Sequence, residues 1–221
     1  MRNFMNTELF IDKLSERFRK PLPGLKAQLQ MAPISRIISI VNLFKTNKPK
    51  KSSVLILLFL KEDKLHFVLT QRHEYNGVHS GQICLPGGKY EDTDDDLYHT
   101  AIREAQEEIN VEPTKIEKIG ELTKLYTPPS NYCIQPFVGF TKNEPNFIKQ
   151  PEEVKEIILT DLIDFIDNPI KGTKPIRTNR NITISAPYYE IGGYTVWGAT
   201  AMILSEFYSI AKEVFEDTST L

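Results

Sequence analysis

The chain has 221 residues, a length that favours one domain with an elaboration over two complete domains. Hydrophobic residues make up 40% of the sequence and aromatic residues 10%, enough for a buried core. The formal net charge of −2 excludes a general attraction to nucleic acid or to an acidic membrane surface. Two cysteines are too few for a disulfide framework. We therefore expect a cytoplasmic protein that binds neither nucleic acid nor membrane.

Residues 1–48 are expected to form an N-terminal helical extension. Apolar side chains at helical spacing predict a helix over residues 7–20, with Thr7 as its N-cap. Prolines and a glycine at residues 21–24 end this helix, and a second short helix is expected before Met31. Charged residues interrupt the early apolar ones, so we expect no secretory leader.

Residues 49–215 are expected to form the main domain, and residues 216–221 a C-terminal tail. The apolar run 53–60 predicts a buried strand, with residues 65–71 as its hairpin partner. Further strands are predicted at residues 82–85, 116–125, 132–140 and 153–159 and in an arm over 181–189. Helices are predicted at residues 96–109, 160–165 and 199–214. Strands surrounding two long helices predict an α+β sandwich with a mixed sheet.

The segment 81–111, GQICLPGGKYEDTDDDLYHTAIREAQEEINV, concentrates the residues that carry chemistry. A predicted strand stops at Pro86. At Gly87 and Gly88 the absence of a Cβ allows a tight turn that presents a carbonyl group to an ion or a phosphate. An acidic loop follows, in which Asp94 or Asp95 is the expected N-cap of the next helix.

Three carboxylates share one face of that helix, because positions i, i+3 and i+4 lie together; they are Glu104, Glu107 and Glu108. Their mutual repulsion favours the binding of a divalent cation, since hard cations take oxygen ligands. A solvated acidic face is the alternative for the helix considered alone. The preceding glycines favour the metal site. Glu104 and Glu108 are then the most direct pair of ligands, and the Gly88 carbonyl is a further one.

This pattern resembles the signature of the Nudix hydrolases, G-x5-E-x7-R-E-U-x-E-E-x-G-U, where U is a bulky apolar residue. Gly88 opens the signature, and residues 103–108, REAQEE, fill its second half. The spacing from Gly88 to Arg103 is one residue longer than the standard, the acidic member falls on Asp94 or Asp95, and Asn110 replaces the late glycine. The resemblance implies an α/β/α sandwich and Mg²⁺- or Mn²⁺-dependent hydrolysis of a nucleoside diphosphate derivative.

The longer spacing is similar to the coenzyme A pyrophosphatase branch of that family. Residues 69–72, 81–94 and 191–201 also resemble segments of this branch. The resemblance implies cleavage of coenzyme A or acyl-coenzyme A to 3′,5′-ADP and a 4′-phosphopantetheine product. ADP-ribose, NADH or a diadenosine polyphosphate remain alternative substrates, and a scaffold that binds a nucleotide without hydrolysing it is a further alternative.

The resemblance also implies roles for individual residues. Gly88, Glu104, Glu107 and Glu108 would bind the metal, and Arg103 would orient the glutamates. The general base stays open between Glu104 and a later carboxylate, Glu152 or Glu153.

Substrate binding is expected from Arg72, Gly87, Gly88 and Lys89. The basic stretch 171–180 is a candidate for a 3′-phosphate, with a solvated loop as the alternative. Four other residues are weaker candidates: His79 for positioning the loop, and Tyr126, Tyr132 and Trp197 for stacking on adenine. A homodimer stays open, with the N-terminal helix as a candidate contributor.

Overall fold

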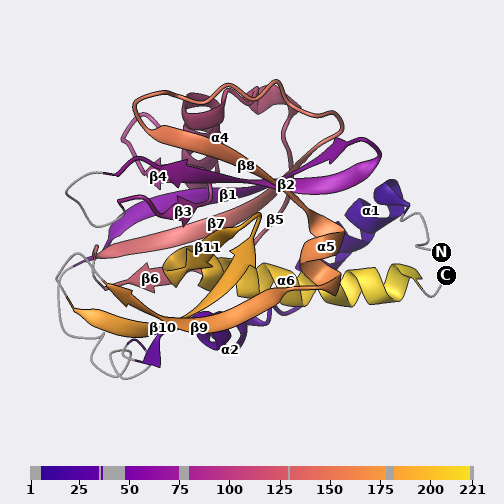
Figure 1. The fold of residues 1–221 in the computed structure, drawn as a ribbon. Coiled ribbons are helices and arrows are strands. Elements are labelled where there is room, and N and C mark those ends of the chain that lie inside the picture. Colours follow the sequence, from indigo (N-terminus) through magenta and orange to yellow (C-terminus); the bar gives the residue numbers. More distant parts are fainter. Residues whose placement is uncertain are drawn as a thin grey trace.

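The computed structural model describes residues 6–34, 36, 48–74, 80–128, 130–177 and 182–219. Within these residues an eight-stranded mixed sheet lies between helices, and a separate three-stranded sheet lies beside it (Figure 1). This confirms the predicted α+β sandwich with a mixed sheet.

The central sheet is organised around its longest strand, β1. Its strands are β1 (Lys50–Lys61), β2 (Lys64–Arg72), β3 (Ile83–Cys84), β4 (Gly87–Lys89), β5 (Glu117–Glu121), β6 (Leu125–Thr127), β7 (Tyr132–Thr141) and β8 (Val154–Asp161). β1 pairs in parallel with β7 and antiparallel with both β2 and β4. β2 pairs with the C-terminal part of β1, and β4 pairs with its N-terminal part. One edge of β1 therefore contacts two different strands.

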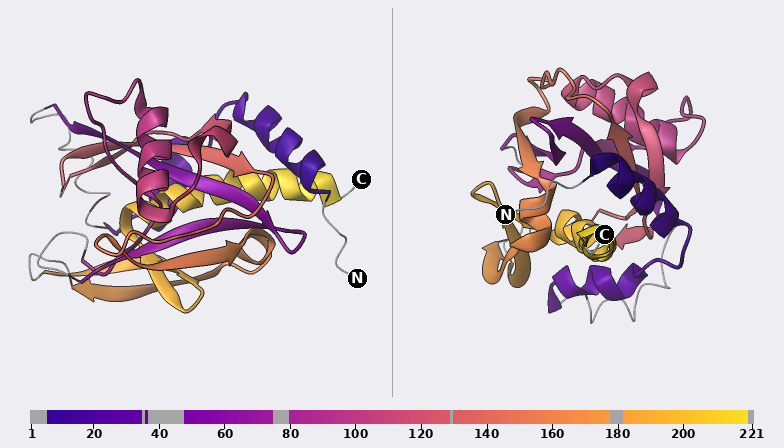
Figure 2. Two further views of the ribbon diagram at one scale, coloured as in Figure 1. Left: turned by 90° about the horizontal axis from the view of Figure 1, so that it is seen from above. Right: turned by 90° about the vertical axis from the view of Figure 1, so that its right-hand side faces the viewer.

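Two helices cover the two faces of this sheet (Figures 1 and 2). Side chains of β1 alternate: Leu55, Leu57 and Phe59 pack with α4 (Leu97–Ile109), whereas Ile56 and Leu58 join the core on the side of α6 (Gly198–Ser219). This alternation is the two-residue period of a strand buried on both faces. α6 ends at Ser219, so the helix continues past residue 214, its predicted end, and includes residues 216–219 of the expected tail. No helix in the described ranges is long and apolar enough to cross a membrane.

The predicted strand at residues 116–125 is wrong over residues 122–124. β5 ends at Glu121, and β6 begins at Leu125. The backbone N–H of Thr123 leaves the sheet and donates instead to the carboxylate of Glu206 in α6, at 3.2 Å. A short 3₁₀ helix, η2 (Pro113–Lys115), precedes β5.

The second sheet corrects the predicted basic loop at residues 171–180. Its strands are β9 (Ile170–Arg177), β10 (Thr183–Ile191) and β11 (Tyr194–Trp197), and the helix α5 (Leu162–Asp167) leads into it. Because β9 is a strand, its lysines point to opposite faces. The ammonium of Lys171 lies 4.4 Å from the ring centroid of Tyr208 in α6, whereas that of Lys174 donates to the hydroxyl of Thr195 at 2.5 Å. Arg180 lies outside the described residues.

The N-terminal extension packs on the main domain through α1 (Thr7–Phe18), α2 (Gly24–Gln28) and the 3₁₀ helix η1 (Leu29–Met31). The N-cap is Asn6, whose side chain accepts from the Leu9 N–H at 3.2 Å, so the expected cap at Thr7 is wrong by one residue. Phe18 lies against Gly120 of β5, where a Cβ would meet its ring at 2.3 Å. Figure 2 shows α1 beside the C-terminal half of α6, where Arg17 pairs with Glu213.

The buried carboxylate of Glu206 joins this extension to the core. Glu206 is 0% exposed and lies in the middle of α6. It accepts from the Gly24 N–H at 3.0 Å, the Gln28 amide at 2.9 Å and the Thr123 hydroxyl at 2.7 Å. A buried carboxylate needs such donors, because burial removes its hydration.

We predict that Glu206→Gln lowers the free energy of unfolding by about 3 kcal/mol. The NH₂ group of the glutamine would face N–H and O–H groups that now donate to the carboxylate of Glu206. Urea denaturation monitored by circular dichroism measures the change. Glu213→Gln is the matched control on the same helix. It removes an exposed ion pair and should cost less than about 1 kcal/mol. Equal losses in the two variants would contradict the role given to Glu206.

Candidate active site

Strand β4 and helix α4 meet at two glycines. Gly87 has φ +152°, and a Cβ there would lie 2.3 Å from the carbonyl oxygen of Ser53. At Gly88 a Cβ would lie 2.2 Å from the carboxylate of Glu104. Only glycine allows this approach of helix to strand. Both glycines belong to β4, which pairs with β1, so the tight turn expected at this position is wrong.

The helix that carries the carboxylates is held at both ends. The side chain of Asp96 accepts from the His99 N–H at 2.8 Å, so Asp96 is the N-cap in place of the expected Asp94 or Asp95. At the other end Asn110 has φ +59°, the left-handed conformation that ends helices. Ala101 and Ala105 are fully buried, and their small side chains bring the helix close to the sheet.

Asp94 anchors Arg103 instead of capping the helix. Its two carboxylate oxygens accept from Nε and Nη2 of Arg103 at 2.8 and 3.1 Å. It also accepts from the Thr100 hydroxyl at 2.8 Å and is 7% exposed. These hydrogen bonds, the one from Arg103 above all, lower the pKa of Asp94 to about 2. Asp94 and Asp95 are the two candidates for the acidic position of the signature. Of these, Asp94 is the one that contacts Arg103.

Arg103 in turn holds two glutamates and the backbone after Gly88. Its Nη1 lies 3.2 Å from Glu104 and 3.0 Å from Glu107, and its Nη2 donates to the Lys89 carbonyl at 3.1 Å. A guanidinium with several fixed partners positions them relative to one another. This geometry is what the predicted orienting role of Arg103 requires.

Glu108 is the most buried of the three helical glutamates. It is 3% exposed and accepts from the Gly87 N–H at 3.3 Å. Burial raises its pKa to about 8, against the opposing charge of Arg72 in β2. Burial also raises the pKa of Glu104. The structure thus brings Glu104, Glu108, Gly87, Gly88 and Arg72 to one place.

Glu107 takes a different position. Its side chain is 57% exposed and faces Arg103. Within the described residues, no three acidic, histidine or cysteine side chains gather closely enough to form a cage for a metal ion. The fit of the site to a divalent cation rests instead on the buried carboxylate of Glu108, on Glu104 beside it, and on the backbone of Gly88 against Glu104.

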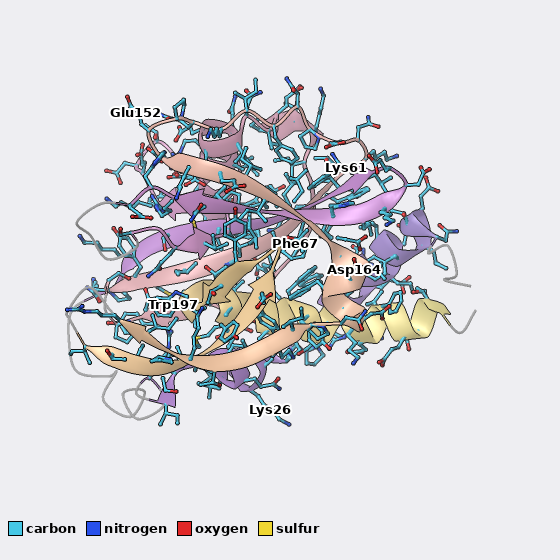
Figure 3. The ribbon with its side chains drawn as sticks, in the orientation of Figure 1. Lys26, Lys61, Phe67, Glu152, Asp164 and Trp197 are labelled. Atoms are coloured by element: carbon cyan, nitrogen blue, oxygen red, sulfur yellow. The ribbon has the colours of Figure 1, made fainter. Side chains whose placement is uncertain are left out.

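The loop before β8 brings a further carboxylate to this place. The Gln150 N–H donates to the Glu108 carbonyl at 2.9 Å, which fixes the loop on the end of α4. Glu153 is close enough that its charge helps to raise the pKa of both Glu104 and Glu108. Glu152 is not among the main causes of either pKa shift and projects at the outer end of β8 (Figure 3). Of the two later carboxylates, the structure therefore favours Glu153.

The remaining candidates are less closely associated with the carboxylates. Cys84 is half-buried, and burial with the nearby charge of Glu108 raises the pKa of its thiol to about 11, as expected for a packing residue. Tyr126 donates to the side chain of Asn131 at 3.0 Å. Trp197 is half-buried at the end of β11 (Figure 3). His79 lies outside the described residues.

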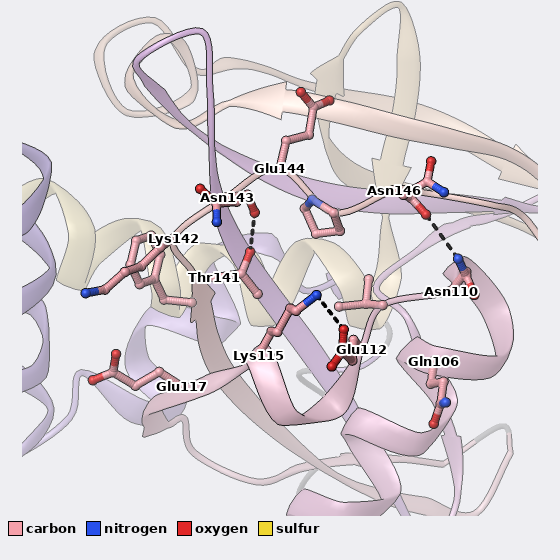
Figure 4. A pocket seen from close by; sticks show the side chains of 13 residues that line it. Gln106, Asn110, Glu112, Lys115, Glu117, Thr141, Lys142, Asn143, Glu144 and Asn146 are labelled. Atoms are coloured by element: carbon pink, nitrogen blue, oxygen red, sulfur yellow. Dashed lines mark hydrogen bonds and ion pairs between the residues drawn. The ribbon is translucent and has the colours of Figure 1, made fainter.

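A pocket of about 810 Å³ near the C-terminal end of α4 does not coincide with this site (Figure 4). Polar side chains line most of it, and it contains none of the predicted site residues. Hydrogen bonds within its own wall, such as Asn110 to the Asn146 carbonyl at 3.2 Å, account for several of these groups.

Metal-free protein should lose stability as the pH rises from about 5 to 8. The pKa of Glu108 is about 8 when folded and near its ordinary value of 4.5 when unfolded, so between these values the folded state holds the proton that the unfolded state has lost. Urea denaturation in the presence of a chelator measures this slope.

Glu108→Gln should flatten the slope and raise stability at pH 8, leaving only the smaller contribution of Glu104. Glu107→Gln is the matched control and should retain the slope, since Glu108 is still present. A slope that is the same with and without Glu108 would show that this carboxyl is not buried as described.

Comparison with known proteins shows the family of the chain. Residues 49–177 match the family model described as the NUDIX domain. The chain is 34% identical over 172 residues to Nudix hydrolase 15, mitochondrial, of Arabidopsis thaliana, covering 75% of this chain and 60% of that protein. It is 35% identical over 128 residues to the peroxisomal coenzyme A diphosphatase NUDT7 of Mus musculus, covering 57% and 53%.

A third relative is Nudix hydrolase 22, chloroplastic, of Arabidopsis thaliana, 30% identical over 195 residues, with 86% of this chain and 61% of that protein covered. The chain thus spans between 53% and 61% of the length of these relatives. The family model covers more than half of the chain, and its match includes β4 with the two glycines and α4 with the three glutamates. The chain therefore belongs to the Nudix family.

Proposed function

We propose that the protein is a metal-dependent pyrophosphohydrolase that cleaves the diphosphate bond of coenzyme A or acyl-coenzyme A. The observation that carries the reaction type is the buried carboxylate of Glu108 against Gly87, with Glu104 against Gly88. Nudix hydrolases generally use divalent metal ions, and this arrangement supports the same requirement here. Mg²⁺ or Mn²⁺ is the proposed cofactor.

In this proposal Glu104, Glu108 and the Gly88 carbonyl hold the cation, and Glu107 completes the set from its exposed position. A bound divalent cation neutralises phosphate oxygens and lowers the pKa of water. Arg103, fixed by Asp94, keeps Glu104 in place during turnover. Every residue named in this proposal comes from one chain, and a homodimer stays a prediction.

Three charged residues would act on the substrate. The positive charge of Arg72 lowers the pKa of Glu108, and this nearness makes its guanidinium the proposed ligand for the diphosphate. Glu153 is the proposed general base, because its charge reaches both Glu104 and Glu108 without a place in the buried pair. Lys89 follows Gly88 and is a further proposed phosphate ligand.

The choice of substrate rests on two likenesses. Residues 69–72, 81–94 and 191–201 resemble the coenzyme A pyrophosphatase branch, and the mouse relative is named a coenzyme A diphosphatase. The products would be 3′,5′-ADP and 4′-phosphopantetheine or its acyl form. The cytoplasmic location inferred from the sequence stays a prediction.

Chromatographic product analysis with Mg²⁺ or Mn²⁺ tests the proposal. Coenzyme A, acetyl-coenzyme A, dephospho-coenzyme A, ADP-ribose, NADH and diadenosine tetraphosphate are compared side by side. We expect selective release of 3′,5′-ADP from the coenzyme A compounds. Faster cleavage of ADP-ribose or NADH would reject the proposed substrate. No cleavage by folded protein that still binds metal would favour a nucleotide-binding scaffold.

Glu108→Gln should lower kcat by at least about a hundredfold while the fold stays intact, because the buried ligand is lost. Steady-state kinetics and circular dichroism measure the two effects. Glu107→Gln should lose less, since Glu107 is exposed and faces Arg103. Near-normal turnover of the Glu108 variant would reject the ligand assignment.

A further inference from the structure

The N-terminal end of β1 presents different side chains to the two faces of the sheet. Ser53 pairs with Gly88, and both face α4 and its carboxylates. Ser52 pairs directly with Lys89, so their side chains lie together on the opposite face. Lys50 is two residues before Ser52 and shares that face, and its ammonium lies 6.0 Å from the ring centroid of Tyr132 in β7.

The hydroxyl of Ser52 is unusual for a buried polar group. Ser52 is 8% exposed, and its Oγ has no hydrogen-bond partner. Its neighbour Ser53 is fully buried and donates to the Gln135 carbonyl at 2.9 Å. Buried hydroxyl groups are nearly always satisfied, and an exception calls for a missing partner.

The two lysines beside Ser52 also lack a counter-charge. In the part of the chain that the structure describes, neither Lys50 nor Lys89 forms an ion pair. The segments outside that part contain no aspartate or glutamate that would supply one. The exposed ammonium groups of Lys50 and Lys89 and the unsatisfied hydroxyl of Ser52 therefore share one face of the sheet. The Ser52–Lys89 pair is next to the Ser53–Gly88 pair in the register.

We propose that Lys50, Ser52 and Lys89 form a subsite for a phosphate group of the substrate other than the diphosphate that is cleaved. This inference rests on the proposed function, since it assigns a place to a second phosphate of the nucleotide. In the described sheet β4 pairs with β1 alone, so no strand covers its other edge. In this proposal the nucleotide bound at Gly88 extends around this edge to the Ser52 face.

The chemistry of the three groups fits a phosphomonoester. A phosphate offers several acceptor oxygens and up to two negative charges, which match two ammonium groups and one hydroxyl donor. For coenzyme A this group is the 3′-phosphate. The subsite would therefore distinguish coenzyme A from dephospho-coenzyme A. It replaces the basic stretch 171–180 in that role, because Lys171 and Lys174 of β9 point to opposite faces.

Calorimetric titration of adenosine 3′,5′-bisphosphate into the whole protein, in buffer with Mg²⁺, tests the subsite without turnover. AMP, which lacks the 3′-phosphate, is the matched ligand. We expect the bisphosphate to bind wild-type protein more tightly than AMP. Ser52→Ala and Lys50→Met should each weaken bisphosphate binding by about tenfold and change AMP binding by less than about twofold.

Adjacent residues of the same strand supply the control variants. Lys51→Met removes a lysine that lies over a tyrosine ring on the opposite face, 5.1 Å from the centroid of Tyr90, and should bind both ligands like wild type. Ser53→Ala should lower stability without weakening binding, because it leaves the Gln135 carbonyl without its donor. Ser52→Ala should leave stability unchanged or raise it, because it removes an unsatisfied hydroxyl.

Several outcomes would overturn the subsite: equal binding of bisphosphate and AMP, wild-type affinity in the Ser52 and Lys50 variants, or an equal loss in the Lys51 variant. The outcome is separate from that of the proposed function. A protein that cleaved none of the coenzyme A compounds would reject the function, while the binding preference would still decide the subsite.

Discussion

The active-site geometry depends on the absence of two Cβ atoms. At Gly87 and Gly88 the backbone of β4 fits between β1 and α4 at distances that any side chain would prevent. The strand stays in register with β1, and the helix comes close enough for its glutamates to meet the strand backbone. The small buried residues Ala101 and Ala105 serve the same approach from the helix side.

This close approach has an electrostatic consequence. Burial removes the hydration of Glu108 and raises its pKa to about 8, although the charge of Arg72 and the hydrogen bond from the Gly87 N–H oppose this rise. The surroundings of Asp94 have the opposite effect on a carboxylate. There a carboxylate with a pKa near 2 fixes Arg103, which fixes Glu104. Asp94 is thus stabilised in its charged form, whereas burial favours the neutral form of Glu108 in the metal-free protein. Arg103 lies between Asp94 and Glu104.

Much of this arrangement follows from the sequence. The helix at residues 97–109 and the grouping of its glutamates were predictable because helical periodicity is local. Other features depended on distant parts of the chain. The interruption after Glu121 reflects Glu206, which lies more than eighty residues further along. The basic stretch 171–180 was predicted as a loop, because lysine-rich composition obscured the two-residue alternation of β9. Glycines 87 and 88 predicted a turn, whereas their function here is close approach within a strand.

The unsatisfied hydroxyl of Ser52 could not be recognised from sequence either, because a serine near the start of a buried strand carries no signal of its own. The signal appears only when register places Lys89 opposite Ser52 and Lys50 on the same face. The same register places Gly88 on the other face, where it lies against Glu104 of α4. β4 therefore separates the carboxylates of α4 from Lys50 and Lys89. A nucleotide with two separate phosphate positions matches that division.

We propose that Glu104, Glu108 and the Gly88 carbonyl hold a divalent cation. Anomalous diffraction from crystals of the whole protein grown with Mn²⁺ tests this metal site. We expect one strong anomalous peak within about 2.5 Å of oxygen atoms from these three residues. A peak bound elsewhere, or no peak in a protein that hydrolyses its substrate in the same buffer, would reject these residues as the metal ligands.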